Sequence, residues 1–373
     1  MRQNRERVKI AIEGEIQTKK RNDMKNVFCK LCLALAVVAA AVGCKSFHTL
    51  SSTKKVAQGA PYELLVVCNA PEWEGELGEA LRALLEEPVP MLNQAEPHFD
   101  VLRITAGDFR NILTEHRNIL KVVVSPQVAQ TAIIAQYDVA AAPQLVMTFQ
   151  GASQQAMVEY LRTNGDALLR VLEMAERDRT VKYAERHNVQ LLNELIKEEF
   201  GVDMRVPKGY ELRSQSADFL WASYEFPAAS QGFFIYAYPY RGKGSLSVER
   251  LVAMRNEFAR RIPGPSDGSY MVTVEQIPDA ETGDYTPFEP DYAVVQIGDR
   301  KWIEMRGFWD VAGDFMGGPF VSYTTVNEAA GEVFTIDCYV HSPKDGKRNY
   351  IRALEHLVYL VKFPAVKTAT VVE

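Results

Sequence analysis

The sequence lacks the local motifs by which most enzymes and nucleotide-binding proteins are recognised. It contains no Gly-x-Ser-x-Gly nucleophile motif, and residues 242–245 (GKGS) lack the earlier glycine that a P-loop needs. The six histidines are scattered, and no two have the spacing that places both on one helix face for a metal ion. We therefore predict no metal site and no cofactor, and we assign no catalytic residue.

Positive charge is also scarce. The formal net charge is -6, and it becomes -11 when residues 1–43, with nine Lys/Arg and four Asp/Glu, are removed. Affinity for nucleic acid depends on Lys and Arg side chains that neutralise phosphates. The acidic balance therefore argues against a nucleic-acid partner.

No apolar run in the chain is long enough to span a bilayer as a helix. Residues 31–42 (LCLALAVVAAAV) have the length of a signal-peptide core, short of the roughly 20 residues of a spanning helix. Lys25 and Lys30 precede this run, which ends in Ala41-Val42-Gly43-Cys44. The ending resembles the lipobox of bacterial lipoproteins, where small residues precede a cysteine that is acylated and becomes the mature amino terminus. Ala41 stands where leucine is usual.

This resemblance predicts a lipoprotein signal peptide over residues 24–43, with lipid attached to Cys44. Residues 44–60 are polar and rich in Ser and Thr, which is typical of a flexible tether. Met24 would be a normal start for the signal, so we expect residues 1–23 to be an upstream extension that is not translated. The alternative is an uncleaved buried helix or membrane anchor that contains a cysteine.

Cysteine is rare, with five in the chain. Cys29 and Cys32 form a C-x-x-C pair, but they lie in the predicted signal segment, which argues against a redox site. After Cys44 only Cys68 and Cys338 remain, each in an apolar, strand-like run. They could pair in an oxidising compartment, but we favour two buried free thiols.

The first folded part is predicted at residues 61–201. We expect strands over residues 62–68, 118–125 and 145–149, and helices over residues 73–87, 108–116 and 153–200. Asp108 and Ser153 are suitable amino-terminal caps, and Gly201 is a suitable carboxy-terminal cap. Strands that alternate with helices predict an α/β-type part.

The second part is predicted at residues 205–363, followed by a tail at 364–373. We expect strands over residues 219–226, 233–238, 269–274, 292–297, 302–309, 320–326 and 332–340, and helices over residues 247–261 and 348–361. Many strands between isolated helices predict an antiparallel sheet flanked by helices. The fold class of the whole chain is therefore α+β.

Six stretches of the sequence carry a family resemblance. They are ELLVVCNAPEWEGELGEAL from Glu63, HRNIL from His116, PKGYELRSQSADFLWASYE from Pro207, GPSDGSYM from Gly264, RGFWDVAGDFMGGPFVSY from Arg306 and KRNYIRALE from Lys347. These resemble a family of uncharacterised Bacteroidetes lipoproteins, the domain of unknown function DUF4837. The resemblance implies an envelope lipoprotein of two α+β parts and assigns no activity. The order of elements after Pro207 is also similar to the Mog1/PsbP-type sandwich, a likeness of fold that carries no function.

Residues 306–323 are the most suggestive stretch for ligand binding. The candidate ligand-binding residues are Arg306, Trp309, Asp310, Asp314 and Tyr323. Glycines in this stretch would let the backbone approach a ligand, and Trp and Tyr offer faces for sugars or peptides. The interpretation that we favour makes residues 317–319 (GGP) a turn and places Phe308, Phe315 and Phe320 in the core.

Three further polar residues have a structural and a functional interpretation. Ser266 lies among Pro and Gly, which favours a turn over a nucleophile. His341 would need Asp310 or Asp314 beside it in space to form a metal site. Arg117 at an exposed end could hold an anionic ligand, but an ion pair with one of the many acids is favoured.

Two hypotheses for function follow. The favoured one is a non-enzymatic lipoprotein, anchored in the membrane through its amino-terminal lipid, that binds an envelope protein or a small ligand. Residues 45–48 (KSFH) lack the acidic run that tends to follow the cysteine of surface-exported lipoproteins in this phylum, which favours the periplasmic face. The alternative is an envelope hydrolase or sugar-active enzyme whose two carboxylates meet only in space.

Overall fold

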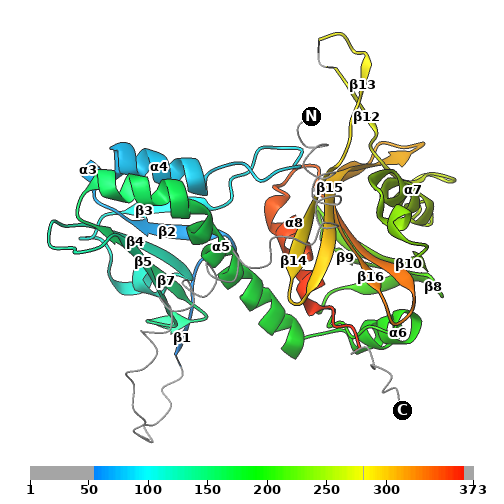
Figure 1. Cartoon of the computed structure of the whole chain (residues 1–373), viewed down its shortest axis with the longest axis horizontal. Helices are drawn as coiled ribbons and strands as arrows, with labels where there is room; N and C mark the ends of the chain where they lie inside the picture. The colour runs from blue at the N-terminus through cyan, green and yellow to red at the C-terminus, as the bar shows by residue number, and fades with distance from the viewer. Residues whose placement is uncertain (1–53, 280, 365–373) are drawn as a thin grey trace, which may run out of the picture. The chain divides into compact units, whose positions relative to one another are not determined.

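The computed structural model describes residues 54–279 and 281–364. Within them the chain has the predicted α+β fold (Figure 1). The residues from Lys54 onward form one compact unit. The predicted signal peptide, Cys44 and residues 365–373 of the tail lie outside the described residues.

The amino-terminal half is built on a five-stranded sheet of order β3-β2-β4-β7-β5. The strands are β2 (Glu63–Val67), β3 (Asp100–Ile104), β4 (Asn118–Val124), β5 (Ala132–Tyr137) and β7 (Leu145–Gly151). All pairings are parallel except that of β5 with β7. The apolar faces of α4 (Glu76–Leu85) and α5 (Gln154–Arg186) share a buried cluster with one face of the sheet. This arrangement confirms an α/β-type first part.

Smaller elements complete this half. They are β1 (Lys55–Val56), α3 (Ala70–Trp73), the 3-10 helix η1 (Asn111–Glu115) and β6 (Ala141–Ala142). Asp108 was expected to cap a helix there, but the Asp108 carboxylate accepts a hydrogen bond from the Thr105 hydroxyl at 2.6 Å instead. The helix begins after Arg110 and has no side-chain cap. That part of the prediction is wrong.

The helical stretch predicted over residues 153–200 is interrupted. Ser153 caps α5 by accepting from the backbone N–H of Ala156, and Gly201 ends α6 (Gln190–Phe200) with a φ of 66°. Between them, α5 ends at Arg186. The buried side chains of α6 pack into the carboxy-terminal core. The predicted boundary between the two parts, after residue 201, instead assigns this helix to the first part.

The carboxy-terminal half is built on an eight-stranded antiparallel sheet of order β11-β15-β16-β17-β10-β9-β8, with β14 also paired to β15. The strands are β8 (Glu211–Ser216), β9 (Phe219–Glu225), β10 (Ser230–Pro239), β11 (Tyr270–Thr273), β14 (Asp291–Ile297), β15 (Arg300–Ala312), β16 (Gly317–Asn327) and β17 (Glu332–His341). A separate hairpin of β12 (Gln276–Pro278) and β13 (Tyr285–Pro287) projects from this half (Figure 1).

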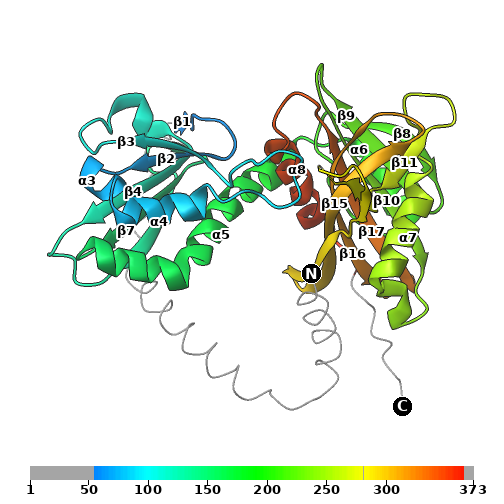
Figure 2. The same ribbon diagram turned by 90° about the horizontal axis from the view of Figure 1, so that it is seen from above.

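Helices cover both faces of the eight-stranded sheet. Helix α6, α8 (Arg348–Glu355) and the 3-10 helix η3 (His356–Leu360) pack on one face, and α7 (Val248–Ala259) packs on the other, preceded by the 3-10 helix η2 (Lys243–Leu246). Figure 2 shows α7 and α8 on opposite sides of the sheet. This confirms the antiparallel sheet flanked by helices, and the comparison with the Mog1/PsbP sandwich stays a prediction.

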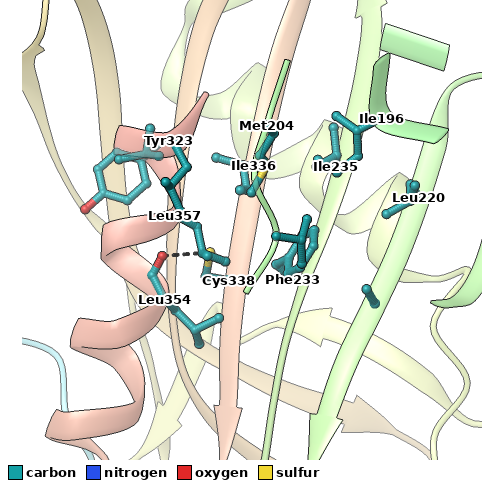
Figure 3. Close-up of a cluster of buried hydrophobic side chains, with 14 of the residues drawn as sticks. Ile196, Met204, Leu220, Phe233, Ile235, Tyr323, Ile336, Cys338, Leu354 and Leu357 are labelled. Carbon is teal, nitrogen blue, oxygen red and sulfur yellow. Dashed lines mark hydrogen bonds between the residues drawn. The ribbon is translucent and has the colours of Figure 1, made fainter. Parts of the chain in front are cut away.

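The α8 face holds the largest buried cluster (Figure 3). Cys338 lies in it, and its thiol donates to the backbone carbonyl of Leu354 at 3.7 Å. Cys68 is buried in the other half, and both cysteines are free. The prediction of two buried thiols is therefore confirmed.

The α7 face contains a fully buried ion pair. Arg255 of α7 donates from Nε to Asp337 of β17 at 2.9 Å, and its Nη1 reaches the Thr273 hydroxyl at 2.9 Å. The guanidinium also stacks over the Phe320 ring. These contacts satisfy a charge whose burial would otherwise cost several kcal/mol.

Charged residues of α8 connect the two halves. Glu96 accepts hydrogen bonds from the backbone N–H groups of Lys347 and Arg348, which are at the start of α8. Arg352 lies 3.0 Å from the carboxylate of Glu173 on α5. Glu355 accepts from Arg306 of β15 and from Arg352. The junction of the halves is therefore a chain of paired charges.

The pairing at Glu355 predicts a loss of stability in acid. Burial alone would raise the pKa of Glu355, but Arg306 and Arg352 outweigh it and lower the pKa from 4.5 to about 2. The stabilisation is thus complete above the unfolded pKa and is lost as the pH falls toward 2. We expect this group alone to lower the free energy of unfolding by about 3 kcal/mol over that interval, measured by urea unfolding at a series of pH values.

The variant Glu355→Gln isolates this contribution, because its unfolding free energy should depend less on pH in that interval. Glu159→Gln, which removes an exposed partner of Arg162, is the matched control and should keep the parental dependence. Equal pH dependence in the parent and Glu355→Gln would contradict the prediction.

Candidate functional site

The five candidate ligand-binding residues do not form one loop. Arg306 and Tyr323 lie on the α8 face of the sheet, where Arg306 pairs with Glu304 and Glu355. Trp309 is buried on the α7 face. Side chains alternate between the faces of a strand, and β15 and β16 together extend through most of this stretch.

The two acids among the five candidates, Asp310 and Asp314, do not form a common site with the other three. Asp310 is exposed on β15, and Asp314 lies in the turn before β16, where it accepts from the Ser266 hydroxyl. This contact supports the structural interpretation of Ser266. Among the residues that the structure describes, no group of three or more His, Cys, Asp or Glu side chains is arranged to hold a metal ion.

The predicted turn at residues 317–319 is displaced. These residues are the start of β16, and the connection from β15 runs through Gly313, which has a φ of 91°. Phe320 is buried as predicted, but Phe315 is fully exposed. The prediction placed the turn too late because it interpreted the glycines and the proline as turn residues. Gly318 is instead required because the backbone of Val340 on the neighbouring strand lies too close for a side chain.

Arg117 and His341 both have partners within the protein. Arg117 pairs with Glu176 of α5, so the favoured ion-pair interpretation is confirmed. The Nδ1 atom of His341 lies 3.3 Å from the Gly317 carbonyl, and since a carbonyl only accepts, Nδ1 is the donor. In the neutral ring, Nε2 is therefore left as an acceptor.

An aromatic cavity of about 520 Å³ lies at one end of the α7 face. It lies beyond the end of α7. The ends of five strands and the β9–β10 turn form it. Its wall includes Trp221, Ala229, Ile262, Met271, Trp309, Val311, Met316 and Tyr339. This volume lies within the range of about 300–1,000 Å³ that is typical of small-molecule sites. We call it the aromatic cavity.

Hydrogen bonds fix the aromatic side chains of the wall. Trp221 donates from Nε1 to the Tyr339 hydroxyl at 2.8 Å, and Trp309 donates from Nε1 to the Val340 carbonyl at 3.2 Å. The rings of Trp309 and Tyr339 meet edge to face, with centroids 5.5 Å apart. Burial raises the pKa of Tyr339 well above its ordinary value, so its phenol is neutral. The aromatic side chains of the wall are therefore uncharged and held in place by hydrogen bonds.

Two glycines make room for these aromatic rings. A Cβ atom at Gly232 would lie 2.4 Å from the hydroxyl oxygen of Tyr339, and one at Gly318 would lie 2.0 Å from the Val340 carbonyl oxygen. Any larger residue at these positions would displace the ring or the strand.

The polar groups of the aromatic cavity lie on its rim. Glu225 is its one carboxylate, and Glu225 Oε1 accepts from the hydroxyls of Ser223 and Ser230 at 2.6 and 3.1 Å. His341 and Lys344 are the other ionisable groups of the lining apart from Tyr339. An apolar wall with a few polar groups is suited to holding a ligand with an apolar body.

Sequence reasoning found one residue of this wall, Trp309. Trp221, Met271 and Tyr339 come from three other strands and were expected only as strand residues. The signal available in the sequence is that aromatic residues and glycines recur at positions that pair across neighbouring strands. Such pairs can be recognised only when the strand order is known.

The fold and the cavity define an α+β protein with an aromatic cavity of the size of a small-molecule site. Residues 189–359 match a family model described as a domain of unknown function, DUF4837, and residues 57–185 match a second one, DUF8532. The first match bears out the resemblance to DUF4837 over residues 189–359. A search of the curated proteins finds no match.

Two solved structures are distantly similar. One is the crystal structure of LpqN, involved in cell envelope biogenesis of Mycobacterium tuberculosis, at 11% identity and a TM-score of 0.26, with 43% of this chain and 81% of LpqN covered. The other is the human StarD13 (DLC2) lipid transfer and protein localization domain, at 13% identity and a TM-score of 0.15, with 46% and 95% covered. Scores this low carry no argument. Among the described helices, none is both long enough and apolar enough to cross a membrane.

The packing of Tyr339 over Gly232 can be tested by adding one methyl group. We expect Gly232→Ala to lower the free energy of unfolding by about 1–3 kcal/mol, because the ring has to move and the bond from Trp221 is lost. Gly244→Ala is the control, since a Cβ there meets no atom within 4 Å. Urea unfolding of both variants measures the difference, and equal stability would contradict this account of the cavity wall.

Proposed function

We propose that this protein is a lipid-anchored cell-envelope protein that faces the periplasm and binds a small ligand with an apolar body in its aromatic cavity. The observation that carries the binding role is the cavity itself, since two tryptophans, a tyrosine and two methionines line a volume of about 520 Å³. A mostly apolar lining with a few polar groups, around a volume of this size, is typical of small-molecule sites.

The envelope location is supported by the sequence. A short apolar run after Lys25 and Lys30 ends in Gly43-Cys44, and Cys44 would carry the lipid. The polar residues that follow would serve as a tether.

The aromatic cavity favours binding over hydrolysis. Cleavage of a glycosidic bond ordinarily requires two carboxyl groups about 5–10 Å apart, and Glu225 is the one carboxylate in the lining. Glu225 also accepts two hydroxyl hydrogen bonds within the protein. The hydrolase alternative therefore has no geometric support at this cavity.

Binding can be tested with N-phenyl-1-naphthylamine, a neutral apolar dye whose fluorescence rises in an apolar site. We expect saturable binding by the parent chain and its loss in Ala229→Trp, because Ala229 is a buried wall residue and an indole there would fill the cavity. Ala106→Trp, at an exposed position of the other half, should bind like the parent. Equal dye binding by all three chains would exclude the cavity as the site.

The anchor is tested separately, by expressing the full chain with labelled palmitate. The parent should incorporate label and enter the detergent phase, and Cys44→Ala should do neither. Unchanged labelling of Cys44→Ala would overturn the lipid anchor without affecting the dye experiment.

A further inference from the structure

The described chain begins beside a second cavity, in the amino-terminal half. Lys54 donates from Nζ to the Asp138 carbonyl at 2.6 Å, and Val56 of β1 lies opposite Ala142 of β6. Asp138 and Ala142 both line a cavity of about 580 Å³ that is bounded by α5. The segment that leads back to Cys44 therefore meets the described structure at the rim of this cavity.

Unpaired cations gather at this rim. Lys182 and Arg186 of α5 line the cavity and are exposed, and neither side chain has a hydrogen bond or ion pair with a described residue. Lys54 contacts a carbonyl, and it has no carboxylate partner in the described part of the chain. The site therefore has a local surplus of positive charge on a chain that is acidic overall.

The other charges of the cavity lining are largely compensated. Arg179 is held by Glu176, and Asp178 lies 3.7 Å from the guanidinium of Arg177. Asp138 accepts from the backbone N–H of Gln144 at 2.9 Å, and it is the one lining acid without a cationic partner. Two cations of the lining, Lys182 and Arg186, and Lys54 beside it thus have no carboxylate partner among the described residues, against one lining acid that has no cationic partner.

Exposed apolar side chains lie in the same region: Tyr137 and Tyr183 line the cavity, Val139 follows Asp138, and Val56 lies opposite Ala142. Val56, Tyr137, Val139 and Tyr183 are between 50% and 70% exposed. Tyrosine, aliphatic side chains and Lys/Arg are the residues that proteins place at the boundary between water and a bilayer. We call these four residues together with Lys54, Lys182 and Arg186 the entry face.

The length of the chain keeps this face near the proposed anchor. Nine residues separate Cys44 from Lys54. Even fully extended, that segment spans roughly 35 Å, so a lipid on Cys44 holds the entry face within that distance of the membrane surface. A lipid on Cys44 limits how far the body lies from the membrane but does not determine which face turns toward it, and a second contact would determine that.

We propose that the entry face docks on an anionic phospholipid membrane and supplies this second contact. The inference rests on the proposed lipid anchor. Lys54, Lys182 and Arg186 would contact lipid phosphates, while Tyr137 and Tyr183 would insert their rings among the headgroups.

The test uses the chain from residue 45, which carries no lipid and keeps the whole compact unit that begins at Lys54. We expect it to sediment with vesicles of phosphatidylglycerol and phosphatidylcholine in equal parts, more than with phosphatidylcholine alone. Lys182→Gln with Arg186→Gln should weaken the partition roughly 30-fold, since each basic residue near an anionic surface contributes about fivefold. Added salt should weaken it as well.

Arg241→Gln with Lys243→Gln is the matched control, because it removes one Arg and one Lys at exposed positions of the other half. It should bind like the parent, and Tyr137→Ser with Tyr183→Ser should bind more weakly. Equal partition of the parent and the Lys182/Arg186 variant, or equal binding to neutral vesicles, would overturn the proposal. Because these chains carry no lipid, such a result would leave the palmitate and dye experiments standing.

Discussion

The contact between the two halves depends on the charges of α8, which are paired with one another and with residues outside that helix. Glu96 caps its first turn, and Arg352 and Glu355 continue the pairing to Glu173 of α5 and Arg306 of β15. Loss of one member would leave a buried partner uncompensated, at a cost of about 3–5 kcal/mol. Such a junction is specific because each charge is paired in a fixed geometry, with Arg306 and Arg352 both donating to Glu355, whereas an apolar contact would tolerate sliding.

The two faces of the large sheet are covered to different extents. On the α8 side, α6, α8 and η3 fill the space, and Cys338 and Leu354 lie in continuous packing (Figure 3). On the α7 side, the helix ends at Ala259 while the strands continue beyond it. The aromatic cavity lies at that uncovered end, and the buried pair of Arg255 with Asp337 lies on the same face where α7 covers the sheet. The cavity is therefore a consequence of a helix shorter than its sheet.

Much of the fold was predictable from the sequence, and the site was not. Strands rich in Val, Phe and Tyr, such as β10 and β17, were found because both of their faces are buried. The edge strands β3 and β8 (DVLRI and ELRSQS) were missed, since one row of their backbone groups and many side chains face water. Of the candidate ligand residues, Trp309 lines the aromatic cavity, while Arg306 and Tyr323 point to the opposite face. The period of a strand separates residues that are close in sequence, so a site assembled from several strands has no contiguous motif.

The protein and the proposed membrane surface both carry net negative charge, so their attraction needs a physical explanation. With a formal charge of -11 after residue 43, the body as a whole is repelled by such a surface. That repulsion is screened within about 8–10 Å at physiological salt, whereas cations at the contact act at shorter range. A lipid on Cys44 would bring the body close regardless of its charge, and the local surplus at Lys54, Lys182 and Arg186 would then select the face that touches. Net repulsion and local attraction together would hold the protein in one orientation, which neither an acyl chain on a tether nor a uniformly basic surface would do.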